Sequence, residues 1–329
     1  MQPPLTVTSD RNRAEDPFIE RSIMSFGSLS QKLKPLVSAR RKVVVLLVIV
    51  IRAGLAVQSV TAQDSKGLGK GSFFGHWGYN RAWYTASDIH FNGPDYDFTL
   101  QHVLAQDRPD AFNAKLYLDP STLWIPQYNY RAGWFFADRW SVSLGLDHMK
   151  YVVTQGQSVQ FVGHVDATRS MDQTVIDGPQ EVTLDQAFLK YEHTDGLNLL
   201  SVDLDRYDRL WQSQNGAFGV RIFEGIHAGP VIPRTDVRLF GKGLNNRWNL
   251  AGFGVGAQAG VQFEFLRHFY IRNTLRAGWI DLPRVLTTGD REDRARQHFW
   301  YVQHAIMVGV HFRIGRSKDA PELPGELRQ

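Results

Sequence analysis

The stretch WNLAGFGVGAQAGVQFEFL, at residues 248–266, has the clearest pattern in the chain. From Ala251 to Phe265 every odd-numbered residue is apolar, whereas the even-numbered positions hold glycine, glutamine and glutamate. A period of two separates two faces only in a β-strand, where successive side chains point to opposite sides. A strand this long with one apolar and one polar face predicts the wall of a barrel that has lipid outside and a polar interior. A long strand in a soluble sandwich is the alternative interpretation.

The same alternation recurs along the chain, and turn-forming residues separate the alternating segments. We expect tight turns at residues 92–95, 137–139 and 194–196. The polar segment 155–182 is expected to be an external loop. Ten strands are predicted, at residues 73–91, 96–106, 124–136, 140–153, 185–193, 197–210, 218–230, 248–266, 269–280 and 298–314. Ambiguous stretches such as 231–247 raise the count to twelve, so the predicted fold is an all-β, antiparallel up-and-down transmembrane β-barrel of 10–12 strands.

The composition of the 329-residue chain agrees with a barrel. A mean hydropathy of −0.29 excludes a membrane protein built of many apolar helices, but barrel strands alternate and keep this average low. Aromatic residues make up 12% of the chain and would supply the girdles at the two membrane interfaces. Cysteine is absent, which excludes disulfides, thiolate metal sites and cysteine nucleophiles. The net charge of +4 is not gathered in a basic patch with aromatic residues, so no nucleic-acid partner is expected.

The N-terminal region has the pattern of an export signal. Three basic residues at 40–42 precede the unbroken apolar run 43–51, and small residues follow up to Ala62. This order predicts a signal peptide that is cleaved after Ala62, and Sec-type export to the outer membrane. An uncleaved anchor helix over 43–60 is the rival interpretation, although it would place Arg52 near the middle of the membrane.

These patterns divide the chain into five parts. The parts are an N-terminal extension (1–39), a signal peptide (40–62), a leader (63–72), the β-barrel (73–315) and a polar tail (316–329) that is expected to be disordered.

At this point the sequence resembles the outer-membrane β-barrel proteins of Gram-negative bacteria, and more narrowly a poorly characterised subset of them without an assigned reaction. The resemblance covers residues 73–314 and is carried by WGYNRAWYTASDIHF (77–91), IPQYNYRAGWF (125–135), GLDHMKYV (145–152), YEHTDGLN (191–198) and IPRTDVRLFG (232–241). It implies a cell-envelope protein surrounded by outer-membrane lipid, with a small molecule or a lipid as a possible ligand. The polar tail departs from barrels that end on an aromatic residue.

Charged residues at predicted inward positions suggest a lumen ion network. Both signs are present, so the charges can pair and close a barrel of this size, whereas unpaired buried charges would be too costly to retain. The predicted lumen network comprises Arg131, Asp147, Lys190, Glu192, Asp203, Asp205, Glu264, Arg272, Arg276 and Arg313.

Acidic residues next to histidines offer a weaker signal for catalysis. The candidates are Asp88, His90, His148, Glu192 and His193. A histidine that is oriented by a carboxylate is the minimum for a general base, and a serine nucleophile such as Ser87 would have to be added. Alternation places Glu192 inward and His193 outward. No spacing favours a metal, and no motif indicates a cofactor.

These expectations leave three functions open. The first is an outer-membrane integral barrel with a polar, largely plugged lumen and a structural, binding or narrow-pore role. The second is a lipid-modifying enzyme of the acyl-hydrolase kind, and the sequence does not decide whether the chain is an enzyme. The third is a small-molecule transporter, with the loops 155–182 and 211–220 as the access route.

Overall fold

The computed structural model describes residues 69–314, apart from 112, 120, 123, 124, 171, 242, 244 and 245. The predicted N-terminal extension, signal peptide and polar tail, and most of the predicted leader, lie outside the described residues.

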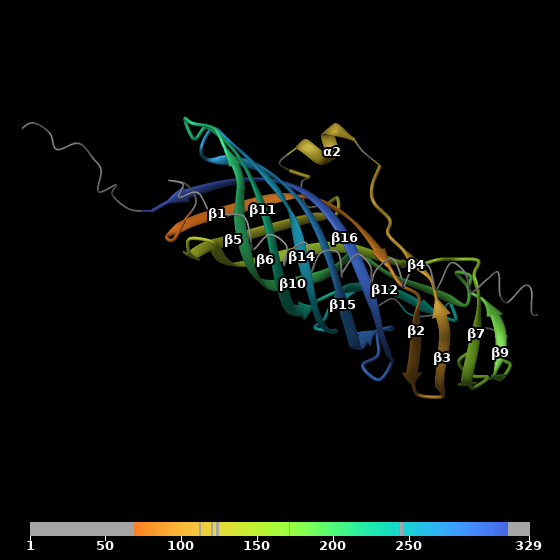
Figure 1. Cartoon of the computed structure of the whole chain (residues 1–329). Coiled ribbons are helices and arrows are strands. Elements are labelled where there is room, and N and C mark those ends of the chain that lie inside the picture. The colour runs from red at the N-terminus through yellow and green to blue at the C-terminus, as the bar shows by residue number, and fades with distance from the viewer. Residues whose placement is uncertain are drawn as a thin grey trace, which may run out of the picture. The chain divides into compact units, whose positions relative to one another are not determined.

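Eight antiparallel strands form a closed ring (Figure 1). Each strand of the ring pairs with the next one along the chain, and β16 pairs with β1 along the whole of β1, which closes the ring. The all-β, antiparallel barrel that the sequence predicts is thereby confirmed, although the ring has eight strands rather than ten to twelve. The ring strands are β1 (Ser72–Tyr84), β5 (Tyr128–Ala137), β6 (Trp140–Val153), β10 (Leu189–Gln212), β11 (Phe218–Val231), β14 (Gly252–Phe265), β15 (Phe269–Leu286) and β16 (Arg294–Arg313).

Two predicted boundaries account for the difference in strand number. The segment predicted as one strand at 73–91 breaks after Tyr84, so its second half, β2 (Ser87–Gly93), and the next predicted strand, 96–106, which contains β3 (Tyr96–Val103), both lie outside the ring. The segments predicted as a hairpin around 194–196 are instead one continuous strand, β10. The residues at the expected turn form a β-bulge, because the pairing of β10 with β6 shifts register between His193 and Leu197. Gly196 takes a φ of +114° there, a conformation that suits glycine.

The remaining strands continue the sheet beyond the ring, and we call them the extension. β2 pairs with the first residues of β16, β3 pairs with β2, and β7 pairs with β3 (Figure 1). The predicted loop 155–182 therefore contains strands, and the predicted turn at 92–95 is confirmed between β2 and β3. The extension consists of β2, β3 (Tyr96–Val103), β4 (Ala105–Gln106), β7 (Ser158–Val165), β8 (Ile176–Asp177), β9 (Gln180–Thr183), β12 (Arg234–Leu239) and β13 (Arg247–Trp248).

The five-residue helix α2 (Ala114–Leu118) lies between β4 and β5, and Asn113 caps its first turn by accepting from the backbone N–H of Lys115. Among the described residues, no helix has the length and apolar character needed to cross a membrane.

The ring has a short-turn end and a long-connection end. Residues 138–139, 213–217 and 266–268 link ring strands at one end, which we call the turn end. At the opposite end, the loop end, longer connections carry the extension. Short turns on one side and long loops on the other are typical of outer-membrane barrels.

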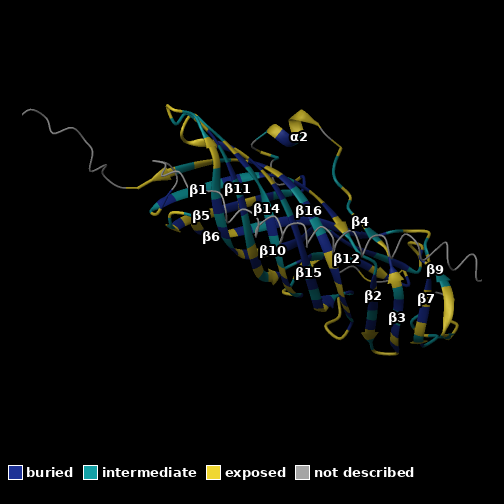
Figure 2. Ribbon diagram, in the orientation of Figure 1, coloured by how far each residue is buried: buried dark blue, intermediate teal, exposed yellow. Residues whose placement is uncertain are grey.

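Burial alternates along β14 as the sequence predicts (Figure 2). Gln258 and Gln262 are each 2% exposed, whereas Val255 is 41% exposed and Phe263 is 52% exposed. The odd-numbered apolar residues of β14 therefore face outward, and this prediction is confirmed. Other ring strands add exposed apolar side chains, and we call the whole set the apolar belt: Trp134, Leu144, Val202, Ile226, Phe253, Val255, Phe263, Ile271, Ile306 and Val308.

The extension encloses an apolar core that reaches into the loop end of the ring. Phe98 on β3 stacks between Phe91 on β2 and Phe161 on β7, with ring centroids 5.1 and 4.9 Å away. The same cluster of buried residues includes Leu199 and Tyr301 from the ring. The apolar core therefore caps the lumen at the loop end.

Truncating Phe98 tests how the extension is held together. Phe98 is 1% exposed, so Phe98→Ala should cost about 3–5 kcal/mol of local stability by leaving a cavity. Hydrogen exchange followed by mass spectrometry should show faster exchange in β2, β3 and β7, with β14 unchanged. Val162→Ala is the matched control, because Val162 on β7 is 40% exposed. Equal exchange in the two variants would contradict this packing.

Candidate functional site

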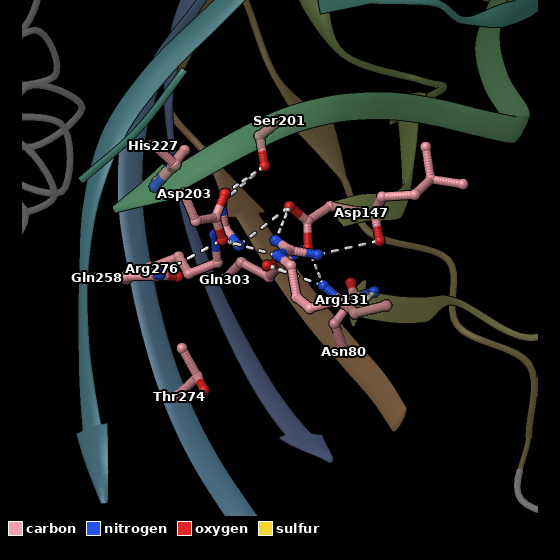
Figure 3. Close-up of polar contacts among 12 residues, drawn as sticks. Asn80, Arg131, Asp147, Ser201, Asp203, His227, Gln258, Thr274, Arg276 and Gln303 are labelled. Carbon is pink, nitrogen blue, oxygen red and sulfur yellow. Dashed lines mark hydrogen bonds and ion pairs between the residues drawn. The ribbon is translucent and has the colours of Figure 1, made fainter. Parts of the chain in front are cut away.

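Four charged side chains from four ring strands meet in the lumen (Figure 3). Arg131 donates from Nε to Oδ2 of Asp203 and from Nη2 to Oδ2 of Asp147, both at 2.7 Å. Arg276 donates from Nη1 to Oδ2 of Asp203 at 3.1 Å, and the same nitrogen lies 3.4 Å from Oδ2 of Asp147. None of the four side chains is more than 3% exposed.

A second ion pair joins this cluster through Asp205. Arg272 donates from Nη2 to Oδ2 of Asp205 at 3.1 Å, and its guanidinium carbon lies 3.4 Å from the centroid of the Phe223 ring. Gln258 donates from Nε2 to both Asp205 and Asp203 and so links the two groups. We call Arg131, Asp147, Asp203, Asp205, Arg272 and Arg276 the charged layer. Its three guanidinium groups face three carboxylates, so the charges balance, as burial in a medium of low dielectric requires.

Glycines on neighbouring strands leave the room that the charged layer occupies. A Cβ atom on Gly145 would lie 2.0 Å from Cδ of Arg131, and one on Gly225 would lie 2.0 Å from Oδ1 of Asp205. Both glycines lie at inward positions of their strands, where any other side chain would displace a charged group. Their small size is therefore part of the site.

Neutral polar residues that the sequence analysis did not single out complete the hydrogen bonding. Ser201 donates to Oδ1 of Asp203 at 2.6 Å (Figure 3). Asn129 donates to Asp147 and to Gln303. Nε2 of His227 and the hydroxyl of Tyr301 lie 2.7 Å apart. Ser201 lies on the same odd-numbered face of β10 as Asp203 and Asp205. The alternation of the strand therefore predicts that Ser201 points into the lumen as well.

Two other members of the predicted lumen network lie at the turn end, away from the charged layer. Oε1 of Glu264 is 2.6 Å from Nε of Arg221, and its Oε2 is 3.6 Å from Nη2 of Arg209. Arg313 donates from Nε to the hydroxyl of Ser72 at 3.1 Å.

Lys190 and Glu192 do not face the lumen. Nζ of Lys190 lies 3.0 Å from Glu192 and 2.6 Å from Asp236, and Arg108 lies 3.0 Å from Glu192. These ion pairs belong to the even-numbered face of β10. The prediction was wrong because it placed a turn at 194–196, whereas the bulge keeps the odd-numbered residues inward on both of its sides.

His193 is inward for the same reason, which reverses the predicted orientations of Glu192 and His193. The His193 side chain is fully buried. Its Nδ1 lies 2.8 Å from the hydroxyl of Thr235, and its ring packs against Tyr151 and Tyr191. Burial among aromatic rings and one neutral hydroxyl gives this histidine no carboxylate to orient it.

The five catalytic candidates are not brought together, since no two of them are in contact among the described residues. Nε2 of His90 lies 2.8 Å from Asp97, on the outward face of the extension. The backbone N–H of His102 donates to Asp88 at 2.8 Å. His148 is 7% exposed, and its Nδ1 lies 2.8 Å from Oδ1 of Asn198.

The described part of the chain holds no group of three or more histidine, aspartate or glutamate side chains with the geometry of a metal site.

The chain was compared with known proteins. No family model matches it, and no curated protein matches it. Among solved structures it is similar to the outer membrane protein OprG from Pseudomonas aeruginosa, with a TM-score of 0.33 and 12% identity over 76% of this chain and 100% of that chain. It is also similar to the outer membrane protein AlkL, with a TM-score of 0.32 and 9% identity over 80% and 100%. For Ail from Yersinia pestis, the TM-score is 0.27 and the identity 11% over 74% and 99%. The barrel assignment itself rests on the strand pairings.

Removing one carboxylate from the charged layer tests its contribution to stability. Asp203→Ala should lower the free energy of unfolding by about 3–5 kcal/mol, because Arg131 and Arg276 would lose one of the two carboxylates that they share and would be buried with Asp147 as their one remaining shared partner. Urea unfolding of the detergent-solubilised barrel, followed by tryptophan fluorescence, measures the change. Asp177→Ala is the control, since Asp177 is 71% exposed and its pairing with His164 should contribute less than about 1 kcal/mol. Equal losses in both variants would contradict the charged layer.

Proposed function

We propose that this chain is an integral outer-membrane barrel whose lumen is closed, and that the ring holds the extension in the water outside the membrane for a structural or binding role. One observation carries the proposal: the charged layer and, toward the loop end, buried aromatic residues of the apolar core lie inside the ring. A barrel of eight strands has an interior just wide enough for side chains to fill.

The outward faces of the ring and of the extension support this placement. The apolar belt on the ring would be in contact with lipid, as in transmembrane barrels. The outward face of the extension is mixed: it carries the polar side chains His90, Asp97, His164 and Asp177 together with exposed apolar residues such as Val162. Outer-membrane lipid is therefore the proposed partner of the belt, and the extension is the proposed surface for a small-molecule or lipid ligand. A Sec-type signal at 40–62 remains part of the proposal.

The two alternative functions receive less support. A transporter needs a continuous path, whereas paired charges and packed aromatic rings occupy successive levels of this lumen. A lipid-modifying enzyme of the predicted kind needs a histidine oriented by an acid near the membrane. His148 and His193 contact a neutral amide and a neutral hydroxyl, and His90 pairs with Asp97 on the extension.

Conductance measures the closed lumen directly. The wild-type barrel in a planar lipid bilayer should give no stable stepwise current, because no water-filled path crosses the charged layer and the apolar core. An open porin in the same bilayer is the positive control, and heat-modifiable gel mobility shows that the sample is folded. Reproducible current steps from the folded wild-type chain would refute the proposal and favour a pore or transporter.

A further inference from the structure

The turn end of the lumen places two arginines directly opposite each other. Arg209 on β10 and Arg221 on β11 are cross-strand partners. Like charges that face each other across two strands destabilise a sheet. Both side chains are largely buried, with exposures of 12% for Arg209 and 5% for Arg221, so water screens this repulsion only weakly. The pairing therefore calls for negative charge close by.

Glu264 is the carboxylate that these two arginines share. Its Oε1 lies 2.6 Å from Nε of Arg221, and its Oε2 lies 3.6 Å from Nη2 of Arg209. One carboxylate thus faces two guanidinium groups, in contrast to the three against three of the charged layer. Within this group of three side chains, positive charge exceeds negative charge.

The guanidinium group of Arg209 also lacks hydrogen-bond acceptors among the described residues. All three guanidinium nitrogens of Arg209 are buried, and none donates a hydrogen bond to another described residue. A guanidinium presents a planar fork of donors that matches the oxygens of a phosphate or carboxylate group. Arg209 therefore has donor nitrogens that Glu264 does not use and that are free to donate to a bound oxyanion.

His311 on β16 adds a further polar group on the same side of the lumen. Its Nε2 donates to the backbone carbonyl of Arg267 at 2.5 Å, and its Nδ1 is buried without a hydrogen-bond partner among the described residues. The His311 ring stacks on Tyr270 with centroids 5.9 Å apart, and Tyr270 is the cross-strand partner of Glu264. His311 thus lies beside the arginine pair, and because Nε2 carries the proton of the neutral ring, its Nδ1 is an acceptor for the hydroxyl of a protonated phosphate group.

We propose that the turn end of the lumen binds a phosphate group, which Arg209 holds with support from Arg221 and His311. A phosphate group offers several acceptor oxygens and enough negative charge to offset the excess that Glu264 leaves. The proposed site requires only inward side chains of the ring strands. It therefore does not depend on whether the lumen conducts ions. Free inorganic phosphate and the headgroup of a phospholipid carry the same chemistry and are the two sources to distinguish.

Calorimetric titration of the refolded barrel with inorganic phosphate, at low ionic strength in a zwitterionic detergent, tests the site. Wild type should bind phosphate saturably, and Arg209→Gln should weaken binding at least about tenfold, because charge-assisted hydrogen bonds are lost. Arg206→Gln is the matched control: Arg206 lies on the opposite face of β10, where it pairs with Asp208, and binding should stay within about twofold.

Three results would overturn the proposal: no saturable heat with wild type, equal binding by Arg209→Gln, or an equal loss in Arg206→Gln. If Arg209→Gln does not fold, as judged by heat-modifiable mobility, Arg209→Lys replaces it. This variant keeps the charge but loses the fork, and it should still bind phosphate more weakly than wild type; unchanged binding would contradict the role of Arg209.

A parallel titration with a short-chain phosphatidic acid separates the two sources. If the lipid competes with inorganic phosphate in wild type, and needs Arg209 to do so, the site takes a lipid headgroup. If inorganic phosphate binds but the lipid does not compete, the site takes a free anion. Both results support the proposal, whereas lipid binding that is insensitive to Arg209→Gln, together with no phosphate binding, refutes it.

Discussion

The pairing of β16 with β1 sets the conditions for the rest of the structure. It runs along all of β1 and closes the ring at eight strands, which fixes the width of the lumen. A ring of this width leaves space for side chains and little else. Inward residues therefore pack against residues from facing strands, and the six charges of the charged layer find their partners inside the ring.

Three groups of inward side chains follow one another along the lumen. At the turn end, Glu264 serves two arginines. Further in, the charged layer balances three arginines with three aspartates, and glycines such as Gly145 make room for the long side chains. Toward the loop end, the aromatic residues of the apolar core replace the charges. The closed lumen that we propose therefore does not depend on a single plug.

The sequence predicted the parts of the fold that depend on local alternation. In β14 and β15 one face is consistently polar, and Gln258, Arg272 and Arg276 lie inside as expected. Arg209, which the sequence analysis missed, continues the odd-numbered face of Asp203 and Asp205, so the signal was present.

The parts that failed depend on contacts between distant segments. β2 and β3 alternate as ring strands do, and only their pairing with β16 and β7 reveals that they leave the ring. The residues 194–196 have the composition of a tight turn, yet they form a bulge because β6 and β12 continue the ladder on both sides of them. Lys190 and Glu192 were misplaced as a result. No local pattern separates a bulge from a turn when the flanking strands are equally regular.

The most direct test of this account is a comparison of three single-cysteine variants, Val255→Cys, Gln262→Cys and Val162→Cys, in a chain that has no cysteine of its own. Each variant is spin-labelled and reconstituted into lipid vesicles, and collision rates with oxygen and with a water-soluble nickel chelate are measured. The account predicts that oxygen dominates at Val255 on the apolar belt, that the nickel chelate dominates at Val162 on the extension, and that neither reaches Gln262 in the lumen. Free access of the nickel chelate to Gln262, or equal access to Val255 and Val162, would contradict a closed lumen inside a membrane-embedded ring.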